Sequence, residues 1–124
     1  MPKALVVDDS RAVRMVLANA LQKFGFDVLQ AASGREGLAA AENEKGELSL
    51  FLVDWNMPEM NGLEFVKRIR CNSRFEAVPL MMVTTETETV QIERAFEAGA
   101  NEYVTKPFTS EIIAGKLRAI GAIP

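Results

Sequence analysis

The sequence contains no histidine, a single cysteine and no concentrated run of basic residues. Without histidine the chain offers no imidazole ligand to a metal ion. Because Cys71 is alone, no disulfide can form within the chain, and a reducing, cytoplasmic environment is expected. Fourteen basic residues against seventeen acidic ones leave a net charge of −3, and no basic run could follow a phosphate backbone. We therefore expect no direct binding of nucleic acid.

Long apolar runs are also missing. The N-terminus passes from Met1-Pro2-Lys3-Ala4 through a short apolar stretch into two aspartates, which is neither a signal peptide nor long enough to cross a bilayer. No linker, repeat or glycine-rich nucleotide loop is present. A chain of 124 residues fits one domain, which buries about two-thirds of its unfolded surface. We expect a single domain over residues 1–124, with no appended output domain and no membrane insertion.

The stretch from Phe51 to Pro58 places a carboxylate at the end of an apolar strand. Residues 48–53 are apolar at nearly every position, which is typical of a parallel strand covered on both faces, and Asp54 follows directly. Pro58 disfavours the α conformation at Met57, so a loop must precede the next helix. Asp54 is therefore expected at the end of a buried strand, beneath a loop and facing a crevice.

The whole chain divides into five strand–helix units. Strands are predicted over Ala4–Val7, Asp27–Ala31, Leu48–Val53, Leu80–Val83 and Glu102–Thr105. Each is followed by a segment with helical spacing that begins at Asp9 or Ser10, Ser33, Asn61, Glu88 or Thr109. The first helix is expected to bury Val13, Val16, Leu17, Ala20, Leu21 and Phe24, and the fourth to bury Ile92, Ala95 and Phe96. Gly25, Gly46 and Gly99 are predicted to end helices.

Five such units predict an α/β fold with a doubly wound, five-stranded parallel sheet, because each helix must return the chain to the same edge. Open sheets of this kind bind ligands outside the carboxyl ends of their strands. The polar residues that follow four of the predicted strands should therefore converge at this edge; they are Asp8, Asp9, Asp54, Thr84 and Lys106.

Converging carboxylates repel one another unless a cation joins them. Oxygen donors without histidine predict a hard ion, Mg²⁺, completed by water and a phosphoryl oxygen. Lys106 would offer that phosphoryl group a positive charge and Thr84 a hydroxyl, which leaves Asp54 as the nucleophile that accepts it. Taken singly, these residues have ordinary explanations as a turn, a strand-end hydroxyl and a surface lysine. Their combination at one edge favours the site.

The whole chain resembles the receiver domain of response regulators, especially the stand-alone chemotaxis type. The matching residues are Asp8-Asp9, Asp54-Trp55-Asn56-Met57-Pro58, Thr84, Tyr103 and Lys106-Pro107-Phe108. The resemblance implies a flavodoxin-like fold with strand order 2-1-3-4-5. It also implies that Asp54 is the phosphoacceptor, and that Mg²⁺ is bound by Asp9, Asp54 and the backbone carbonyl of Asn56, with Asp8 close by.

The resemblance further implies a switch, in which Thr84 and Tyr103 report phosphorylation to the face formed by the fourth helix, the fifth strand and the fifth helix. The Tyr103 ring is expected to point to solvent until Thr84 is drawn inward. A sensor histidine kinase or phosphotransfer protein would supply the phosphoryl group, and the signal would leave by protein binding. We expect a monomeric signalling protein rather than an enzyme, with only Mg²⁺-dependent self-phosphorylation and autodephosphorylation. Glu88-Thr89 stands where chemotaxis members tend to carry lysines, which argues against a flagellar motor target.

Two other classes would use parts of the same pattern. A phosphatase of the haloacid dehalogenase type would need a second acid two residues after its nucleophile, where this chain has Asn56, and a cap for which it is too short. A flavodoxin-like electron carrier would need a Ser/Thr/Gly loop after the first strand to hold the flavin phosphate. Asp8 and Asp9 would repel that phosphate instead.

Overall fold

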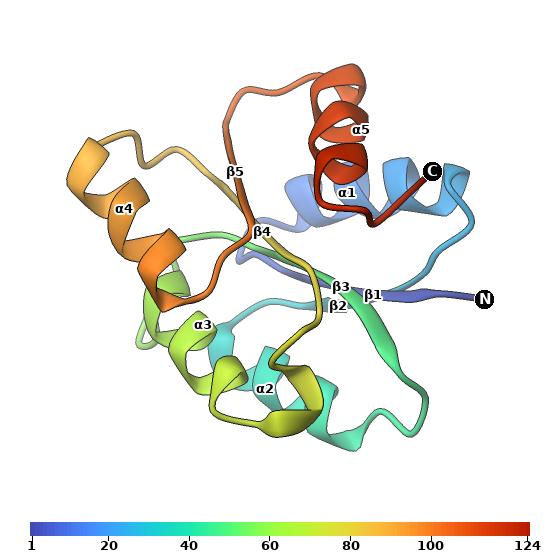
Figure 1. Cartoon of the computed structure of the whole chain (residues 1–124), viewed down its shortest axis with the longest axis horizontal. Coiled ribbons are helices and arrows are strands. Elements are labelled where there is room, and N and C mark those ends of the chain that lie inside the picture. The colour runs from blue at the N-terminus through green and yellow to red at the C-terminus, as the bar shows by residue number, and fades with distance from the viewer.

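A computed structural model describes residues 1–124, which form one parallel sheet with helices on both faces (Figure 1). The strands run in the order β2-β1-β3-β4-β5, and all neighbours are parallel. Their bounds are β1 Lys3–Val7, β2 Asp27–Ala31, β3 Leu48–Val53, β4 Leu80–Thr84 and β5 Glu102–Thr105. The predicted fold class and strand order are confirmed.

The helices begin where the sequence predicts them. They are α1 Arg11–Lys23, α2 Gly34–Asn43, α3 Gly62–Arg70, α4 Thr89–Ala98 and α5 Ser110–Ala119. Four have side-chain caps that accept a backbone N–H three residues ahead, from Ser10, Ser33, Asn61 and Thr109. Glu88 makes no such bond, so the start of α4 lacks a side-chain cap. None of these helices is long and apolar enough to span a membrane.

The core has two parts, one on each face of the sheet. Helices α1 and α5 cover one face, where Leu17, Leu21, Ile113 and Leu117 are buried against the strands (Figure 1). Helices α2, α3 and α4 cover the other, where the ring of Phe51 meets those of Phe65 and Phe75 edge to face. Phe75 belongs to a short 3₁₀ helix, η1 (Ser73–Phe75), which is too short for its periodicity to be recognised in the sequence.

Three residues expected in the core are exposed. Val16 and Phe24 on α1 are 55% and 37% exposed, and Phe96 on α4 is 42% exposed. Helical spacing shows that a residue lies on the apolar stripe along one side of a helix. It does not show whether that residue lies at the centre of the stripe, facing the core, or at its flank, nearer to solvent. Val16 and Phe24 lie on the flank, where they line an open hollow of about 670 Å³ between α1 and α5 together with Phe108.

Arg70, at the end of α3, ties together the segments that lead into β4 and β5. Its guanidinium donates to the carbonyls of Phe75 at 2.6 Å, Val78 at 2.7 Å and Gly99 at 2.8 Å, and to Oδ1 of Asn101 at 3.0 Å. The same Asn101 oxygen accepts the Leu80 N–H at 2.8 Å. Burial lowers the pKa of Arg70. This hub lies at the amino ends of the strands, opposite the predicted site.

Candidate functional site

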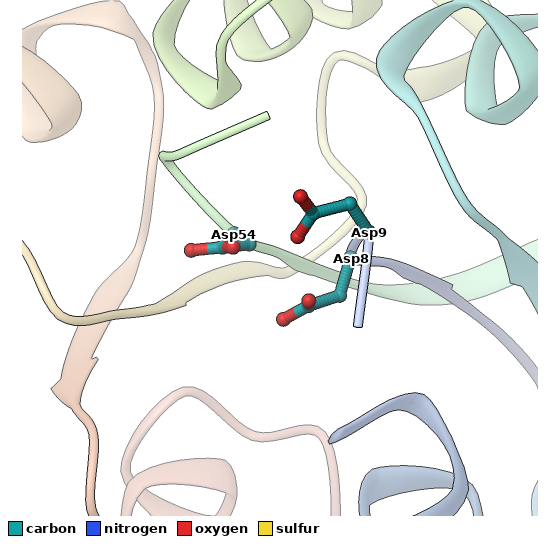
Figure 2. A group of neighbouring side chains, drawn as sticks. All are labelled: Asp8, Asp9 and Asp54. Carbon is teal, nitrogen blue, oxygen red and sulfur yellow. The ribbon is translucent and has the colours of Figure 1, made fainter. Parts of the chain in front are cut away.

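The sheet register places the acidic residues side by side. Strands β1 and β3 are neighbours, and Val7 pairs with Val53, so Asp8 and Asp54 leave adjacent strands at the same level. The Asp54 N–H donates to the Val7 carbonyl at 2.9 Å, which fixes this position. Figure 2 shows the carboxylates of Asp8, Asp9 and Asp54 gathered at the strand ends, with one oxygen of each within 4.8 Å of the others. The predicted convergence is confirmed for all three.

Lys106 joins the two buried carboxylates. Its Nζ lies 2.9 Å from Oδ2 of Asp8 and 3.5 Å from Oδ2 of Asp54. Asp8 and Asp54 are 1% and 4% exposed, whereas Asp9 is exposed to solvent. The backbone of Lys106 is held by its N–H, which donates to the Thr84 carbonyl at 2.8 Å. One ammonium among three carboxylates leaves the cluster with excess negative charge.

The surroundings of Asp54 disfavour its ionised form. Burial and the charge of Asp8 raise the pKa of the Asp54 carboxyl, and Lys106, Thr84 and the Asn56 N–H oppose this shift. The Asn56 N–H donates to Oδ1 of Asp54 at 3.4 Å. A carboxylate that is destabilised in this way is stabilised by a nearby cation.

Thr84 and Tyr103 reach the site from β4 and β5. Thr84 is fully buried, and its hydroxyl accepts the Glu86 N–H at 3.3 Å. The Tyr103 hydroxyl donates to the Glu86 carbonyl at 2.6 Å, and the residue is only 7% exposed. Burial, followed by the charges of Glu86 and Asp54, raises the pKa of Tyr103 to about 12. The expectation that this ring points to solvent is wrong for the structure described: the ring lies inward, because the Glu86 carbonyl offers its hydroxyl a partner there.

Asn56 turns its side chain away from the carboxylates. Its amide nitrogen donates to Oγ1 of Thr85 at 3.2 Å. The backbone carbonyl therefore remains as the candidate metal ligand of this residue. The three carboxylates form a hard, all-oxygen donor set, which fits Mg²⁺.

Gly62 is a site residue that the sequence analysis missed. A Cβ on this residue would lie 2.3 Å from the Asp54 carbonyl and 2.8 Å from Cα of Trp55. The Gly62 N–H also donates to the Trp55 carbonyl at 2.8 Å. The start of α3 can thus pack directly against the backbone that carries Asp54. A glycine in the first turn of a helix, where propensity disfavours it, was the available signal.

The loop over the site contains a strained turn. Glu59 has a φ of 68°, and the Met60 N–H donates to the Pro58 carbonyl at 2.8 Å, which together describe a γ-turn. Positive φ at a non-glycine residue is uncommon and clusters at functional loops. The predicted loop after β3 is thus present, and this turn reverses the chain within it before α3 begins.

A doubly wound sheet whose strand ends carry an acidic cluster, a lysine and a buried threonine is typical of the signalling domains of two-component systems. The response regulator receiver domain pattern matches residues 4–118. The chemotaxis protein CheY1 of Helicobacter pylori is 41% identical over 119 residues, covering 95% of both chains. A chemotaxis protein CheY homolog of Campylobacter jejuni is 42% identical over 120 residues, covering 95% of this chain and 91% of that protein.

Solved structures agree with the sequence comparison. The Vibrio cholerae chemotaxis protein CheY4 superposes with a TM-score of 0.89 at 38% identity, covering 97% of this chain and 98% of that one. The chain belongs to the response regulator receiver domain family and is closely related to the CheY chemotaxis response regulators. Members of this family bind Mg²⁺ at an acidic pocket, with which the Asp8, Asp9 and Asp54 cluster agrees.

Proposed function

We propose that this protein is a response regulator that accepts a phosphoryl group on Asp54 in a Mg²⁺-dependent reaction and signals by phosphorylation-dependent protein binding. The observation that carries the proposal is the position of Asp54, buried beside Asp8 with its Oδ2 3.5 Å from Nζ of Lys106. Asp8 is also buried beside Lys106, but its two oxygens are already held closely, by the Ser10 N–H at 2.8 Å and by Lys106 at 2.9 Å. The contacts of the Asp54 oxygens are longer, 3.4 Å from the Asn56 nitrogen and 3.5 Å from Lys106, which leaves Asp54 as the better nucleophile.

In the proposed reaction an Asp54 oxygen attacks the phosphorus of a phosphohistidine, an acyl phosphate forms and the phosphorus–nitrogen bond breaks. The electron pair of that bond stays on the imidazole of the donor. Asp8, Asp9, Asp54 and the Asn56 carbonyl would hold Mg²⁺, which when bound supplies positive charge to the phosphoryl oxygens. Lys106 neutralises part of the same charge, and the Thr84 hydroxyl offers a hydrogen bond.

The donor and the target are other proteins. Because the chain has no histidine of its own, its physiological phosphodonor would be a sensor histidine kinase or phosphotransfer protein, and we place the reaction in the cytoplasm. Self-phosphorylation and autodephosphorylation are the only chemistry proposed for the chain itself. Thr84 and Tyr103 would carry the signal to α4, β5 and α5, since the Tyr103 hydroxyl is bonded to the loop that precedes α4.

Mass spectrometry after incubation with acetyl phosphate tests the acceptor. We expect addition of one phosphoryl group in the presence of Mg²⁺, and loss of the modification with EDTA or in Asp54→Ala. Asp27→Ala is the matched control, because Asp27 is an exposed aspartate on β2 and should leave labelling unchanged. Equal labelling of Asp54→Ala would refute the assignment.

Trp55 provides an independent test of the metal. It is the only tryptophan and follows Asp54, so Mg²⁺ binding should change its fluorescence. Asp9→Ala should weaken this response strongly, since one fewer carboxylate remains for a strongly hydrated ion. An unchanged titration in Asp9→Ala would show that the ion is bound elsewhere.

A further inference from the structure

The charge of the chain is concentrated around α4 and β5. Residues 84–105 contain five glutamates and one arginine, a net charge of −4, whereas the other residues together carry the +1 that leaves the chain at −3. Helix α1 is the opposite, with Arg11, Arg14 and Lys23 and no acidic residue. An uneven distribution of this size directs partners of one sign to one side of a protein.

The side of α4 that faces β5 can be identified from its neighbours. Arg94, Glu97 and Ala98 line a hollow between α4 and α3, so the opposite flank of α4 faces away from α3. Glu88, Ile92 and Phe96 are spaced four residues apart and lie on that flank. Figure 1 shows β5 between α4 and α5. The flank therefore borders β5, with Glu88 at its first turn and the exposed Phe96 at its last.

The flank of α5 that faces β5 is identified in the same way. Nζ of Lys116 lies 3.4 Å from Oε1 of Glu102 on β5, so Lys116 and Ile112, one turn earlier, border that strand. Ile112 is 47% exposed. The basic charge of Lys116 is thereby compensated within the chain, whereas Glu88 at the N-cap of α4 and Glu93 on α4 are exposed and form no ion pair.

We propose that the α4–β5–α5 face, formed by Glu88, Ile92, Glu93, Phe96 and Ile112, binds a basic, amphipathic segment of a partner protein. Apolar side chains of the partner would cover Phe96 and Ile112, and its lysines or arginines would meet Glu88 and Glu93. Surfaces that carry phosphate are unsuitable, because these glutamates repel them. This assignment rests on the proposed function in one respect: that function makes binding of the segment the step by which the signal leaves the protein.

The Tyr103 hydrogen bond links this face to the site. Its hydroxyl donates to the Glu86 carbonyl. The side chain of Glu86 in turn accepts the Glu88 N–H at its Oε1, at 3.3 Å. A displacement of the ring therefore moves the backbone that presents the acidic first turn of α4. Since binding and switching are reciprocal, a basic partner that prefers one arrangement stabilises it.

Two synthetic amphipathic peptides test the proposal with the intact, ¹⁵N-labelled protein. Both carry the same leucine and phenylalanine positions, and the flanking positions are lysine in one and glutamate in the other. We expect the lysine peptide to bind about tenfold more tightly than the glutamate peptide at low salt, to lose that advantage at high salt and to shift amides in residues 86–105 and 112–116. Equal affinities, or shifts confined to other elements, would overturn the proposal.

Charge-reversal variants distinguish an effect of the α4–β5–α5 face on peptide binding from an effect of the net charge of the protein. Glu88→Lys with Glu93→Lys should invert the preference for the two peptides, because both residues are exposed and make no side-chain hydrogen bond. Glu42→Lys with Glu47→Lys is the matched control, since it changes the net charge equally on another part of the chain. An equal inversion in the control would overturn the proposal. Labelling of Asp54 by acetyl phosphate, measured separately in both variants, shows whether the proposed function fails on its own.

Discussion

The two ends of the strands treat charge in opposite ways. At the carboxyl ends, Asp8 and Asp54 are buried together with one lysine between them, and burial raises the pKa of Asp54. At the amino ends, Arg70 is partly buried, and three carbonyls and Asn101 surround its guanidinium. At the carboxyl ends the negative charge is only partly neutralised within the chain, which suits binding of a cation and a reaction. At the amino ends the charge of Arg70 is fully hydrogen-bonded within the chain, which suits stability.

The largest effect should follow from removing the cation at the amino ends. We expect Arg70→Met to lower the free energy of unfolding by about 3 kcal/mol, because it removes several hydrogen bonds from one charged donor to partly buried carbonyls. Arg68→Met is the matched control in the same helix: its exposed pair with Glu64 is worth roughly 0.3–0.5 kcal/mol. Urea denaturation of both variants measures the difference. Similar losses in the two would mean that Arg70 is an ordinary surface residue.

A methyl group at Gly62 should be the next most damaging change. Its Cβ would meet the Asp54 carbonyl at 2.3 Å, and backbone cannot move aside, so we expect Gly62→Ala to cost about 2 kcal/mol. Gly115→Ala in α5 is the control, because nothing lies within 4 Å of its Cβ and alanine should stabilise that helix by roughly 0.5–1 kcal/mol. Thermal unfolding should therefore give shifts of opposite sign. A shift of the same sign in both would contradict the close packing at Asp54.

Removal of the negative charge at Asp54 should stabilise the protein, the reverse of the result at Arg70. We expect Asp54→Asn to gain on the order of 1 kcal/mol at neutral pH without Mg²⁺, because a buried charge next to Asp8 is lost. The folded pKa of Asp54 lies above its unfolded value, so the protonated form stabilises the fold at low pH, and this contribution is lost as the pH rises through the folded pKa. The gain should thus shrink toward pH 4.

Unfolding of wild type and Asp54→Asn at pH 7 and pH 4 measures this dependence. Asp27→Asn, at an exposed position, should show no comparable gain. Mg²⁺ should stabilise the wild type and narrow its difference from Asp54→Asn, since the ion binds only the folded cluster. Destabilisation of Asp54→Asn at pH 7 would show that Lys106 compensates Asp54 fully.

The smallest effect is expected at Tyr103. Tyr103→Phe removes one hydrogen bond to the carbonyl of Glu86, a partly exposed residue that can bond to water instead, and should cost roughly 0.5 kcal/mol. Tyr103 is the only tyrosine, so ultraviolet absorbance at high pH reports this hydroxyl alone. Because its folded pKa is raised to about 12, its contribution is complete below the ordinary tyrosine pKa of about 10 and is lost as the pH rises through about 12. Titration near pH 10 in the folded protein would contradict the inward ring.

The sequence predicted the fold and the composition of the site because both depend on local signals. Apolar runs that end in carboxylates define the strands, and parallel topology then brings Asp8 and Asp54 together. It did not predict Gly62, Arg70 or the inward ring of Tyr103. These depend on contacts between segments distant in the chain, such as Arg70 with Gly99, and on choices between two partners that periodicity does not encode. The burial predicted for Val16 and Phe24 was wrong for a related reason: helical spacing identifies the apolar side of a helix but not which of its residues face the core directly.

The way α4 is attached gives it the mechanics of a lever. Its last residues are held at the Gly99 carbonyl by Arg70, and its first turn has no side-chain cap but is joined to Tyr103 through Glu86. A ten-residue helix is about 15 Å long, so a shift of about 1 Å at Glu88 would tilt it by roughly 4° around a fixed end near Gly99. A small displacement at Glu88 would thus become a change in the angle at which α4 presents its side chains.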